Sequence, residues 1–298
     1  MNEASELFNV ERDRLRGLAY RMVGSISDAE DIVQDAWLRW QGCDQSKIEN
    51  PNHYIVRIVS NLSLDRLRAN KKHRETYVGS WLPEPNLENF PAPETANPEH
   101  QQAETDQVTV AFLLALERLS PAERTAFILH DVFAYEFSEV SEFLERSSAS
   151  CRQLASRARK ALKDEKPRFA TSLEEGNRLA LAFQQAIVDG DIASLTKLLS
   201  ADTTFVSDGG GKVAAVPAPV VGADKVAKMI LGFSKLYRDR NDITSTLTTI
   251  NDIPGFVLWE GNRPLQTLSL EIGRDGLIGT IYVVRNPEKL NHIAARHR

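Results

Sequence analysis

Hydrophobic positions divide the chain into three blocks. In residues 1–77 they recur every three or four positions, as in the stripe that begins at Leu7, which is the period of a helix with one buried face. We expect one helix after a cap at Ser27 and a long one from about Pro51 to Arg74. Pro51 suits the first turn, where its missing amide costs nothing. The first block is therefore predicted to be all helical.

Residues 107–168 show the same period in four shorter pieces. Ser120 is a good N-cap, with Pro121 at the first helical position and Glu123 three residues later. The last two pieces have the form of a helix-turn-helix, and Ser147 is placed to cap the second of them. The expected helices cover residues 106–118, 121–132, 138–144 and 148–163.

Residues 173–298 combine helical patterns with short apolar runs between glycine-rich turns. Two amphipathic helices come first, and Gly190 is a natural stop for the first of them. A sequence of consecutive strands with tight turns predicts an α+β fold with a mostly antiparallel sheet. The expected elements are TTFVS, a turn at 209–211, the strand KVAAV, a helix in ADKVAKMILGFSKLY, and strands near 243–250, 256–259, 264–272 and 277–285.

A proline-rich acidic stretch separates the first two blocks. Residues 84–106 carry six acidic side chains and no Lys or Arg, and five of the chain's 13 prolines lie within 83–98. This composition predicts an extended linker rather than a folded element. Four segments are therefore expected: residues 1–77, the linker 78–106, residues 107–168 and residues 173–298.

The net charge of −5 averages over unlike parts of the chain. Residues 57–74 and residues 152–168 each carry a net charge of +5, whereas residues 84–106 carry −6. The distribution of charge, more than its total, bears on binding partners. An acidic total therefore does not exclude nucleic acid.

Composition excludes several classes of protein. Hydrophobic residues make up 42% of the chain and charged residues 26%, as in ordinary globular proteins. No apolar run reaches the ~18 residues of a membrane-spanning helix, and the first residues lack the apolar stretch of a secretory signal. Two cysteines are too few for a disulfide framework and fit a reducing compartment. We expect a cytoplasmic protein.

The second helix of the expected helix-turn-helix has a basic outer face. Its apolar residues recur every three or four positions from Cys151 onward, which leaves the basic residues outside. Arg152 and Gln153 are expected to read base edges, because a guanidinium pairs with guanine and a carboxamide with adenine. A basic surface helix is the alternative. The residues expected to meet phosphates are Arg157, Arg159 and Lys160.

These segments resemble a known family. DAEDIVQDAWLRW followed by YIVRIVSNLSLDRLR is similar to region 2 of the extracytoplasmic-function sigma factors, and the segment from LSPAERTAF to SRARKAL is similar to their region 4. The two matches cover about residues 5–75 and 107–165, in the family's order. The resemblance implies a dissociable promoter-recognition subunit of bacterial RNA polymerase that is not an enzyme and holds no metal or cofactor.

The resemblance also implies three sets of contacts. The acidic set fits this assignment independently, because such a helix repels DNA and suits a basic protein surface; a favourable helix N-terminus beside solvent is the alternative. The residues expected to face the polymerase core are Asp28, Asp31, Gln34 and Asp35. Those expected at the −10 element are Asn61, Arg66, Arg68, Lys71, Lys72 and Arg74. Those expected at the −35 element are Arg152, Gln153, Arg157, Arg159 and Lys160.

Ordinary members of that family end near residue 170, so residues 173–298 need a separate explanation. Their order of elements is similar to the SnoaL-like, nuclear-transport-factor-like cone fold. Three motifs resemble those of a sigma-factor group with this extension, and imply that the extra domain regulates the sigma modules in cis. We expect an intramolecular docking surface with Trp81 as its aromatic anchor. The motif residues are Trp81, Pro83, Pro85, Asp208, Gly209, Gly210, Gly211, Lys212, Asn286, Pro287 and Leu290.

Two other functions remain open from the sequence. One is a SnoaL-like isomerase or cyclase fused to a DNA-binding segment, with Asp208 as a base if it is buried; an Asp before three glycines is more often a turn former. The first histidine of this block, His292, lies near an end that we expect to be irregular. The other is a ligand-sensing helix-turn-helix repressor. Residues that either line a pocket for a small ligand or pack in the core are Phe205, Met229, Phe233, Tyr237, Phe256, Trp259 and Tyr282.

Overall fold

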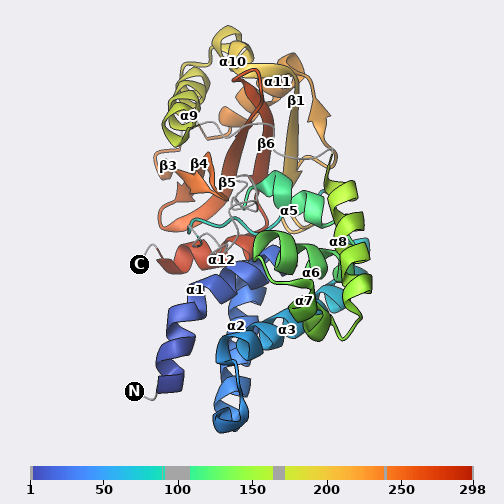
Figure 1. Ribbon diagram of the computed structural model, residues 1–298. Helices are drawn as coiled ribbons and strands as arrows, with labels where there is room; N and C mark the ends of the chain where they lie inside the picture. The colour runs from blue at the N-terminus through green and yellow to red at the C-terminus, as the bar shows by residue number, and fades with distance from the viewer. Residues whose placement is uncertain (1–2, 89, 91–107, 164–171, 238–239, 297–298) are drawn as a thin grey trace. The chain divides into compact units, whose positions relative to one another are not determined.

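A computed structural model describes residues 3–88, 90, 108–163, 172–237 and 240–296 of the chain (Figure 1). The chain forms two compact units. The helical unit comprises residues 1–75 and 89–166, and the C-terminal unit comprises residues 76–88 and 167–298. The first residues of the expected linker thus belong with the C-terminal unit, and the two expected helical segments belong together.

The helical unit begins with three long helices, α1 (Glu3–Val23), α2 (Ile26–Gly42) and α3 (Pro51–Glu75), and a short 3-10 turn, η1 (Gln45–Lys47). Ser25 caps α2, because its hydroxyl accepts a hydrogen bond from the Asp28 amide at 3.0 Å. The predicted cap at Ser27 is wrong, since the helix begins before that residue. The predicted start of α3 at Pro51 is confirmed.

The second group of helices is shorter. Ser120 and Glu123 form the predicted capping box at the start of α6. The helix predicted over 121–132 changes after Phe127 into a π-helical turn, which brings Ile128 and Leu129 into the core. The elements are α5 (Val110–Leu116), α6 (Pro121–Phe127), η3 (Ile128–Val132), α7 (Phe137–Leu144) and α8 (Ser148–Leu162).

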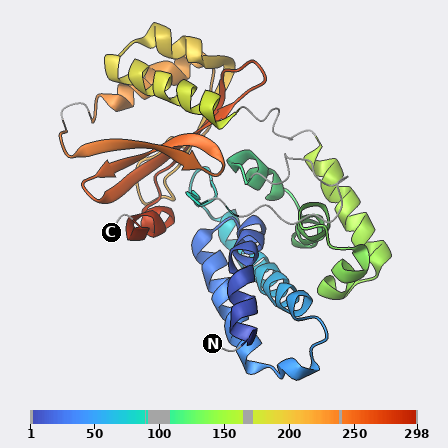
Figure 2. The same cartoon turned by 60° about the vertical axis from the view of Figure 1, so that its left-hand side comes forward.

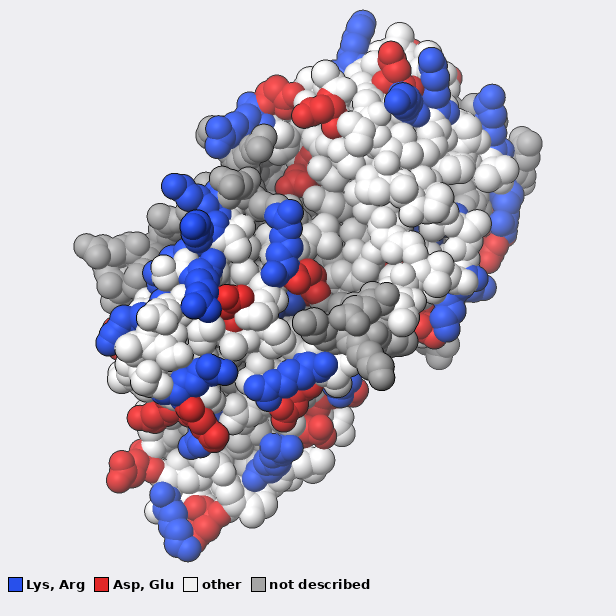
Figure 3. All heavy atoms as spheres, turned by 90° about the vertical axis from the view of Figure 1, so that its right-hand side faces the viewer, with Lys and Arg blue, Asp and Glu red and all other residues white. Residues whose placement is uncertain are grey.

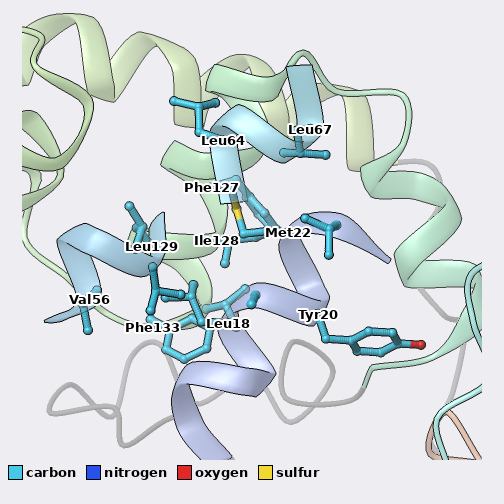
Figure 4. Packing of buried hydrophobic residues seen from close by; sticks show 14 of the residues in the cluster. Leu18, Tyr20, Met22, Val56, Leu64, Leu67, Phe127, Ile128, Leu129 and Phe133 are labelled. Carbon is cyan, nitrogen blue, oxygen red and sulfur yellow. The ribbon is translucent and has the colours of Figure 1, made fainter. Parts of the chain in front are cut away.

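Both groups of helices share one hydrophobic core. Leu18 and Met22 of α1, Leu64 of α3, and Phe127 and Ile128 from the second group lie in a single buried cluster (Figure 4). Removing this apolar surface from water stabilises the two groups together. The helical unit is therefore one packed body rather than two independent modules. Among the described residues, no helix combines the length and apolarity needed to cross a membrane.

The described part of the C-terminal unit contains a six-stranded sheet in the order β2-β1-β6-β5-β4-β3. Strands β1 and β6 pair in parallel, and the other neighbours pair antiparallel. The predicted α+β fold with a mostly antiparallel sheet is confirmed. The strands are β1 (Leu199–Asp208), β2 (Val220–Val221), β3 (Ile243–Ile250), β4 (Ile253–Glu260), β5 (Arg263–Ile272) and β6 (Ile278–Val284).

Helices cover both faces of this sheet (Figure 2). Along β6, Ile281 and Val283 belong to the core under α9, α10 and α11, whereas Tyr282 and Val284 point to the other face, as strand alternation requires. That second face carries the red helix α12 in Figure 2. The helices are α9 (Leu173–Asp189), α10 (Ile192–Leu198), α11 (Ala223–Ser234) and α12 (Pro287–Arg296).

Two expectations for the C-terminal unit are wrong. KVAAV, residues 212–216, forms no strand, because the chain leaves the sheet at a turn in which Gly210 and Gly211 both have positive φ. His292 does not lie in an irregular end but inside α12. The predicted stop at Gly190 is confirmed by its left-handed φ of 69° at the end of α9.

Candidate functional site

Helix α8 presents the basic face that its sequence predicts. Ser147 caps the helix, and its hydroxyl accepts a hydrogen bond from the Ser150 amide at 3.2 Å. Cys151 and Ala158 are buried on the inner face. Lys and Arg side chains gather on the surface that includes this helix (Figure 3). The exposed residues of α8 include Arg152, Gln153, Arg157, Arg159 and Lys160.

Two of these basic side chains make surface contacts. Arg159 donates two hydrogen bonds to the Asp131 carboxylate, at 2.5 and 3.2 Å. The Arg152 guanidinium lies over the Phe137 ring, 5.7 Å from its centre. Exposed contacts of this kind contribute little free energy. Both guanidiniums can therefore exchange these partners for nucleic acid at small cost.

Asp28 differs from the other acidic residues expected at the polymerase core. Its carboxylate forms an ion pair with Arg66 and accepts a hydrogen bond from the Asn70 amide at 3.0 Å, so it fixes α2 to α3. The other three acidic or amide residues are exposed on α2 and are Asp31, Gln34 and Asp35. Arg66, which is expected at the −10 element, thus already forms an ion pair inside the helical unit.

The remaining residues of the expected −10 set lie along α3. Asn61 is half-buried, whereas Arg68 is exposed and pairs with Asp65 at 3.1 Å. The backbone of the end of α3 is helical. The side chains of Lys71, Lys72 and Arg74 lie outside the described residues.

Polar contacts join the two groups of helices inside the helical unit. Arg124 of α6 is 2% exposed and donates hydrogen bonds to the Arg21 carbonyl at 3.0 and 3.1 Å. Its guanidinium also pairs with Glu117. At the other end, His53 of α3 contacts the Glu142 carboxylate of α7 at 3.1 Å. The expected −10 and −35 helices are therefore held in one body.

Linker residues 82–86 are buried against the C-terminal unit. This part forms neither helix nor strand, as predicted for a linker, but it is packed against the C-terminal unit, where a fully buried carboxylate binds it. Asp208, at the end of β1, accepts hydrogen bonds from the Tyr77 hydroxyl at 2.6 Å and the Leu82 amide at 2.9 Å. It also accepts from the Gly210 amide at 2.9 Å, as a turn former does.

Lys289 of α12 completes this arrangement. Its ammonium donates to Asp208 at 2.7 Å and to the Leu82 carbonyl at 2.5 Å. It also lies 4.4 Å from the centre of the Trp81 ring and 4.8 Å from that of Tyr77. Trp81 is half-buried, and it contacts the C-terminal unit by covering the Lys289 ammonium. We call Tyr77, Leu82, Asp208, Asn286 and Lys289 the linker clamp.

The Tyr77 hydroxyl is held from two sides. Asn286 donates to it at 3.0 Å while it donates to Asp208. Burial and the neighbouring carboxylate raise the pKa of Tyr77, so the hydroxyl keeps its proton at neutral pH. Gly210 is required here, because its φ is +60° and a Cβ would overlap the Asn286 amide.

Contacts beyond the clamp extend the docked segment. The Asn86 amide donates to the Asn251 side chain at 3.1 Å, and the Asn251 amide donates to the Asn86 carbonyl at 2.7 Å. His292 reaches the Pro85 carbonyl with Nε2 at 2.8 Å. Lys212 pairs with Glu288 at 2.6 Å on the surface, which links the second and third motifs. Motif residues that are buried include Pro83, Pro85 and Leu290.

Sequence reasoning missed two clamp residues. Tyr77 is the last residue of the first predicted segment, and no periodic pattern marks it. Lys289 lies inside the third motif, but its ammonium could be assigned only once Asp208 was known to be buried. The signal that could have found it is charge: a fully buried carboxylate needs a cation or several donors.

Comparisons with known proteins agree with both units. Residues 7–73 match Sigma-70 region 2, and residues 109–162 match Sigma-70, region 4. Over 305 residues the chain is 36% identical to the ECF RNA polymerase sigma factor SigJ of Mycobacterium tuberculosis. The aligned region covers 99% of this chain and 96% of that protein. This chain belongs to the extracytoplasmic-function (ECF) sigma factors.

Other relatives agree with this family. The crystal structure of M. tuberculosis SigJ covers 97% of this ECF sigma factor and 98% of that chain, with a TM-score of 0.73. The ECF RNA polymerase sigma factor SigG of the same organism is 29% identical over 222 residues, 65% of this chain and 58% of that protein. The SigJ matches cover the C-terminal unit as well as the two sigma regions.

The C-terminal unit of this ECF sigma factor also contains a cavity of about 820 Å³. It lies between the sheet and helices α9 and α11. Trp259 and Tyr282 are buried outside it, and the Tyr282 hydroxyl donates to Glu271 at 2.7 Å. Seven residues were left open by the sequence between a pocket and the core, and five of them line the cavity: Phe205, Met229, Phe233, Tyr237 and Phe256.

Proposed function

We propose that this chain is an alternative sigma factor that directs bacterial RNA polymerase to particular promoters and is modulated in cis by its SnoaL-like domain. Helix α8 reads the −35 element, α3 engages the −10 element, and the exposed acidic face of α2 binds the core enzyme. The observation that carries this proposal is full-length similarity to an RNA polymerase sigma factor, with both sigma regions in order.

The exposed face of α8 supports the assignment at the −35 element. Arg152 and Gln153 lie in the first turns after the Ser147 cap, where a recognition helix meets base edges. Their side chains are exposed, and the Arg152 contact with Phe137 is weak. Arg157 and Lys160 follow on the outer face, where they suit phosphates.

The linker clamp supports modulation in cis. The segment between the two sigma regions is tied to the SnoaL-like domain by a buried carboxylate and a buried ammonium. Any complex that needs residues 77–86 free must first separate Leu82 from Asp208 and Lys289. Clamp closure and polymerase engagement are thereby linked equilibria.

Transcription with purified components tests the proposal. Core enzyme plus the full chain is incubated with a library of random promoter sequences, and the transcribed templates are sequenced. We expect enrichment of a −35 and a −10 element at fixed spacing. Charge reversal at both Arg152 and Arg157 should abolish the −35 preference and leave core binding intact. Lys197→Glu and Arg263→Glu, which make the same charge change on the C-terminal unit, serve as controls.

Three results would contradict the proposal. Binding of the chain to duplex DNA without any association with core enzyme would favour the repressor. Turnover of a ketosteroid or polyketide, lost in Asp208→Asn, would favour the isomerase or cyclase. Unchanged transcription in Lys289→Met, although hydrogen exchange shows residues 77–86 released, would remove the modulation in cis.

A further inference from the structure

The cavity in the C-terminal unit has an apolar wall and one charged residue. Phe183, Phe205, Phe256 and Leu268 are among the side chains that line it. Among the described lining residues, Arg285 is the one that carries a formal charge. Apolar pockets with a few placed polar groups are typical of small-molecule sites, and 820 Å³ lies in their usual size range of about 300–1,000 Å³.

Arg285 has unused capacity for hydrogen bonding. Its Nη1 donates to the Ala214 carbonyl, and its Nη2 lies 3.4 Å from the Tyr237 hydroxyl. Its Nε is buried and, within the described chain, has no hydrogen-bond partner. The described residues also give Arg285 no carboxylate partner. A guanidinium on the wall of an apolar cavity, without a carboxylate partner among the described residues, suits a ligand oxygen with negative charge.

We propose that this cavity binds a small apolar anion, such as a hydrophobic carboxylate, and that its occupancy stabilises the linker clamp. The anion lies at Arg285, and the apolar body lies between α9, α11 and the sheet. The coupling rests on the proposed modulation in cis, whereas binding itself does not depend on it.

Cavity and clamp are neighbours along two strands. Ser207 of β1 lines the cavity, and the next residue, Asp208, is the clamp carboxylate. Arg285 lines the cavity, and the next residue, Asn286, holds Tyr77. The amides of Arg285 and Asn286 both donate to the Asp208 carbonyl, at 2.7 and 3.1 Å. A ligand bound to Arg285 is thus connected by backbone hydrogen bonds to Asp208, which binds the linker.

One loop also serves both sites. It starts at Asp208 in the clamp and ends at residues 214–217, which line the cavity. The turn between them is tight, since a Cβ on Gly209 would lie 2.8 Å from the Ala215 Cβ. A ligand that packs against 214–217 therefore favours the loop conformation in which Asp208 accepts from Leu82. By linkage, loss of the clamp must weaken ligand binding by the same factor by which the ligand stabilises the clamp.

Two fluorescent probes of similar size test binding to the full chain. 1-Anilinonaphthalene-8-sulfonate is an apolar anion, and N-phenyl-1-naphthylamine is its neutral counterpart. We expect the sulfonate to bind saturably at one site. Arg285→Met should weaken it at least about tenfold, the effect of one lost charged hydrogen bond, and leave the neutral probe within about twofold. Arg263→Met, an exposed arginine outside the cavity, should change neither probe.

A second variant guards against misfolding at Arg285. Met229 lines the cavity from α11 and is half-buried, so Met229→Trp narrows the cavity without removing a polar contact. Both probes should then bind more weakly, with the helical content unchanged by circular dichroism. Probe fluorescence that survives in both Arg285→Met and Met229→Trp would place the probe elsewhere and overturn the site.

Hydrogen exchange measures the coupling. With the sulfonate bound, the Leu82 and Asn86 amides, which donate to Asp208 and Asn251, should exchange several-fold more slowly. Tyr77→Phe should weaken the sulfonate, as reciprocity requires. Binding without any change in these amides would overturn the coupling.

A second copy of the chain is the competing occupant. Val188, Phe233 and Leu236 line the cavity and are 67%, 43% and 68% exposed. If copies cover this opening, probe affinity falls as protein concentration rises and the elution volume shifts; that result would overturn the small ligand. Probe binding that persists in a chain unable to support transcription would leave the site standing and contradict only the proposed function.

Discussion

Helix α8 and the linker clamp both depend on charged side chains, but in opposite environments. On α8 the basic groups are exposed, and their contacts with Asp131 and Phe137 lie at the surface. In the clamp, Asp208 is fully buried and Lys289 is 8% exposed, and each has its partners within the protein. The charged groups of α8 are therefore available to a binding partner, whereas those of the clamp are already paired with each other.

This difference separates binding from stability. A surface charge contributes little to the free energy of unfolding, because water screens it in the folded and unfolded states alike. A buried charge that loses its partner is strongly destabilising. Substitutions on α8 should therefore change recognition without unfolding, and substitutions in the clamp should change stability and linker docking together.

The largest effect is expected for Asp208→Ala. This change leaves the Lys289 ammonium and the Leu82 amide without their carboxylate, and an uncompensated buried charge costs about 3–5 kcal/mol. Urea denaturation of the full chain, followed by hydrogen exchange of the C-terminal unit, measures the loss. Asp208→Asn keeps one oxygen and should lose less. A loss below about 1 kcal/mol in the alanine variant would contradict a buried ionic clamp.

Arg152→Ala should have the next largest effect, confined to recognition. We expect a loss of about 1–3 kcal/mol of discrimination at one base pair of the −35 element. Arg157→Ala should instead weaken all promoters alike and lower the salt slope by about 1. Titration of promoter variants with core enzyme plus the chain, at several salt concentrations, separates the two. Uniform weakening by Arg152→Ala would assign that residue to phosphate.

Asp28→Asn tests a position between the two extremes. Its half-buried carboxylate holds Arg66 and Asn70, so we expect a loss of about 1 kcal/mol in the unfolding of the helical unit. Asp31→Asn, on the exposed face of the same helix, should stay within about 0.5 kcal/mol and weaken binding to core enzyme instead. Equal losses of stability in the two variants would contradict a structural role for Asp28 that Asp31 lacks.

The smallest effect concerns pH. Burial and Asp208 raise the pKa of Tyr77 above the ordinary value of 10.0, and Glu288 adds to the rise. The docked linker holds the protonated hydroxyl, so its stabilisation is complete below pH ~10 and is lost progressively above it. Burial also raises the pKa of Tyr135 and of Tyr282, so ultraviolet difference titration should show several tyrosines that ionise late. Tyr77→Phe should remove one tyrosine from this late step; an unchanged late amplitude would mean that Tyr77 is not held by the clamp.

Local chemistry explains what the sequence predicted well. The caps at Ser120 and Ser147, the start at Pro51 and the stop at Gly190 depend on neighbours three or four residues away. The exposed face of α8 follows from its period alone. The same local signal does not distinguish Ser25 from Ser27 as the cap of α2, since both precede the same apolar stripe.

Long-range packing explains what the sequence did not predict. KVAAV has the composition of a strand, but the glycine turn before it directs residues 214–216 to the cavity instead. The proline-rich composition of residues 82–86 predicts an extended segment. Its burial depends on contacts with residues more than 100 positions away, which the composition does not encode. Tyr77 and Lys289 meet across more than 200 positions, which no local pattern encodes.

Asp208 uses two kinds of atom for two purposes. Its backbone carbonyl accepts hydrogen bonds from the Arg285 and Asn286 amides, and any residue at this position has such a carbonyl. Its side-chain carboxylate binds the linker and Lys289. Genetically, this predicts intragenic suppression. Alleles that lose the carboxylate should be rescued by Lys289→Met, which removes the stranded charge, and the rescued protein would keep its fold while its promoters no longer respond to the domain.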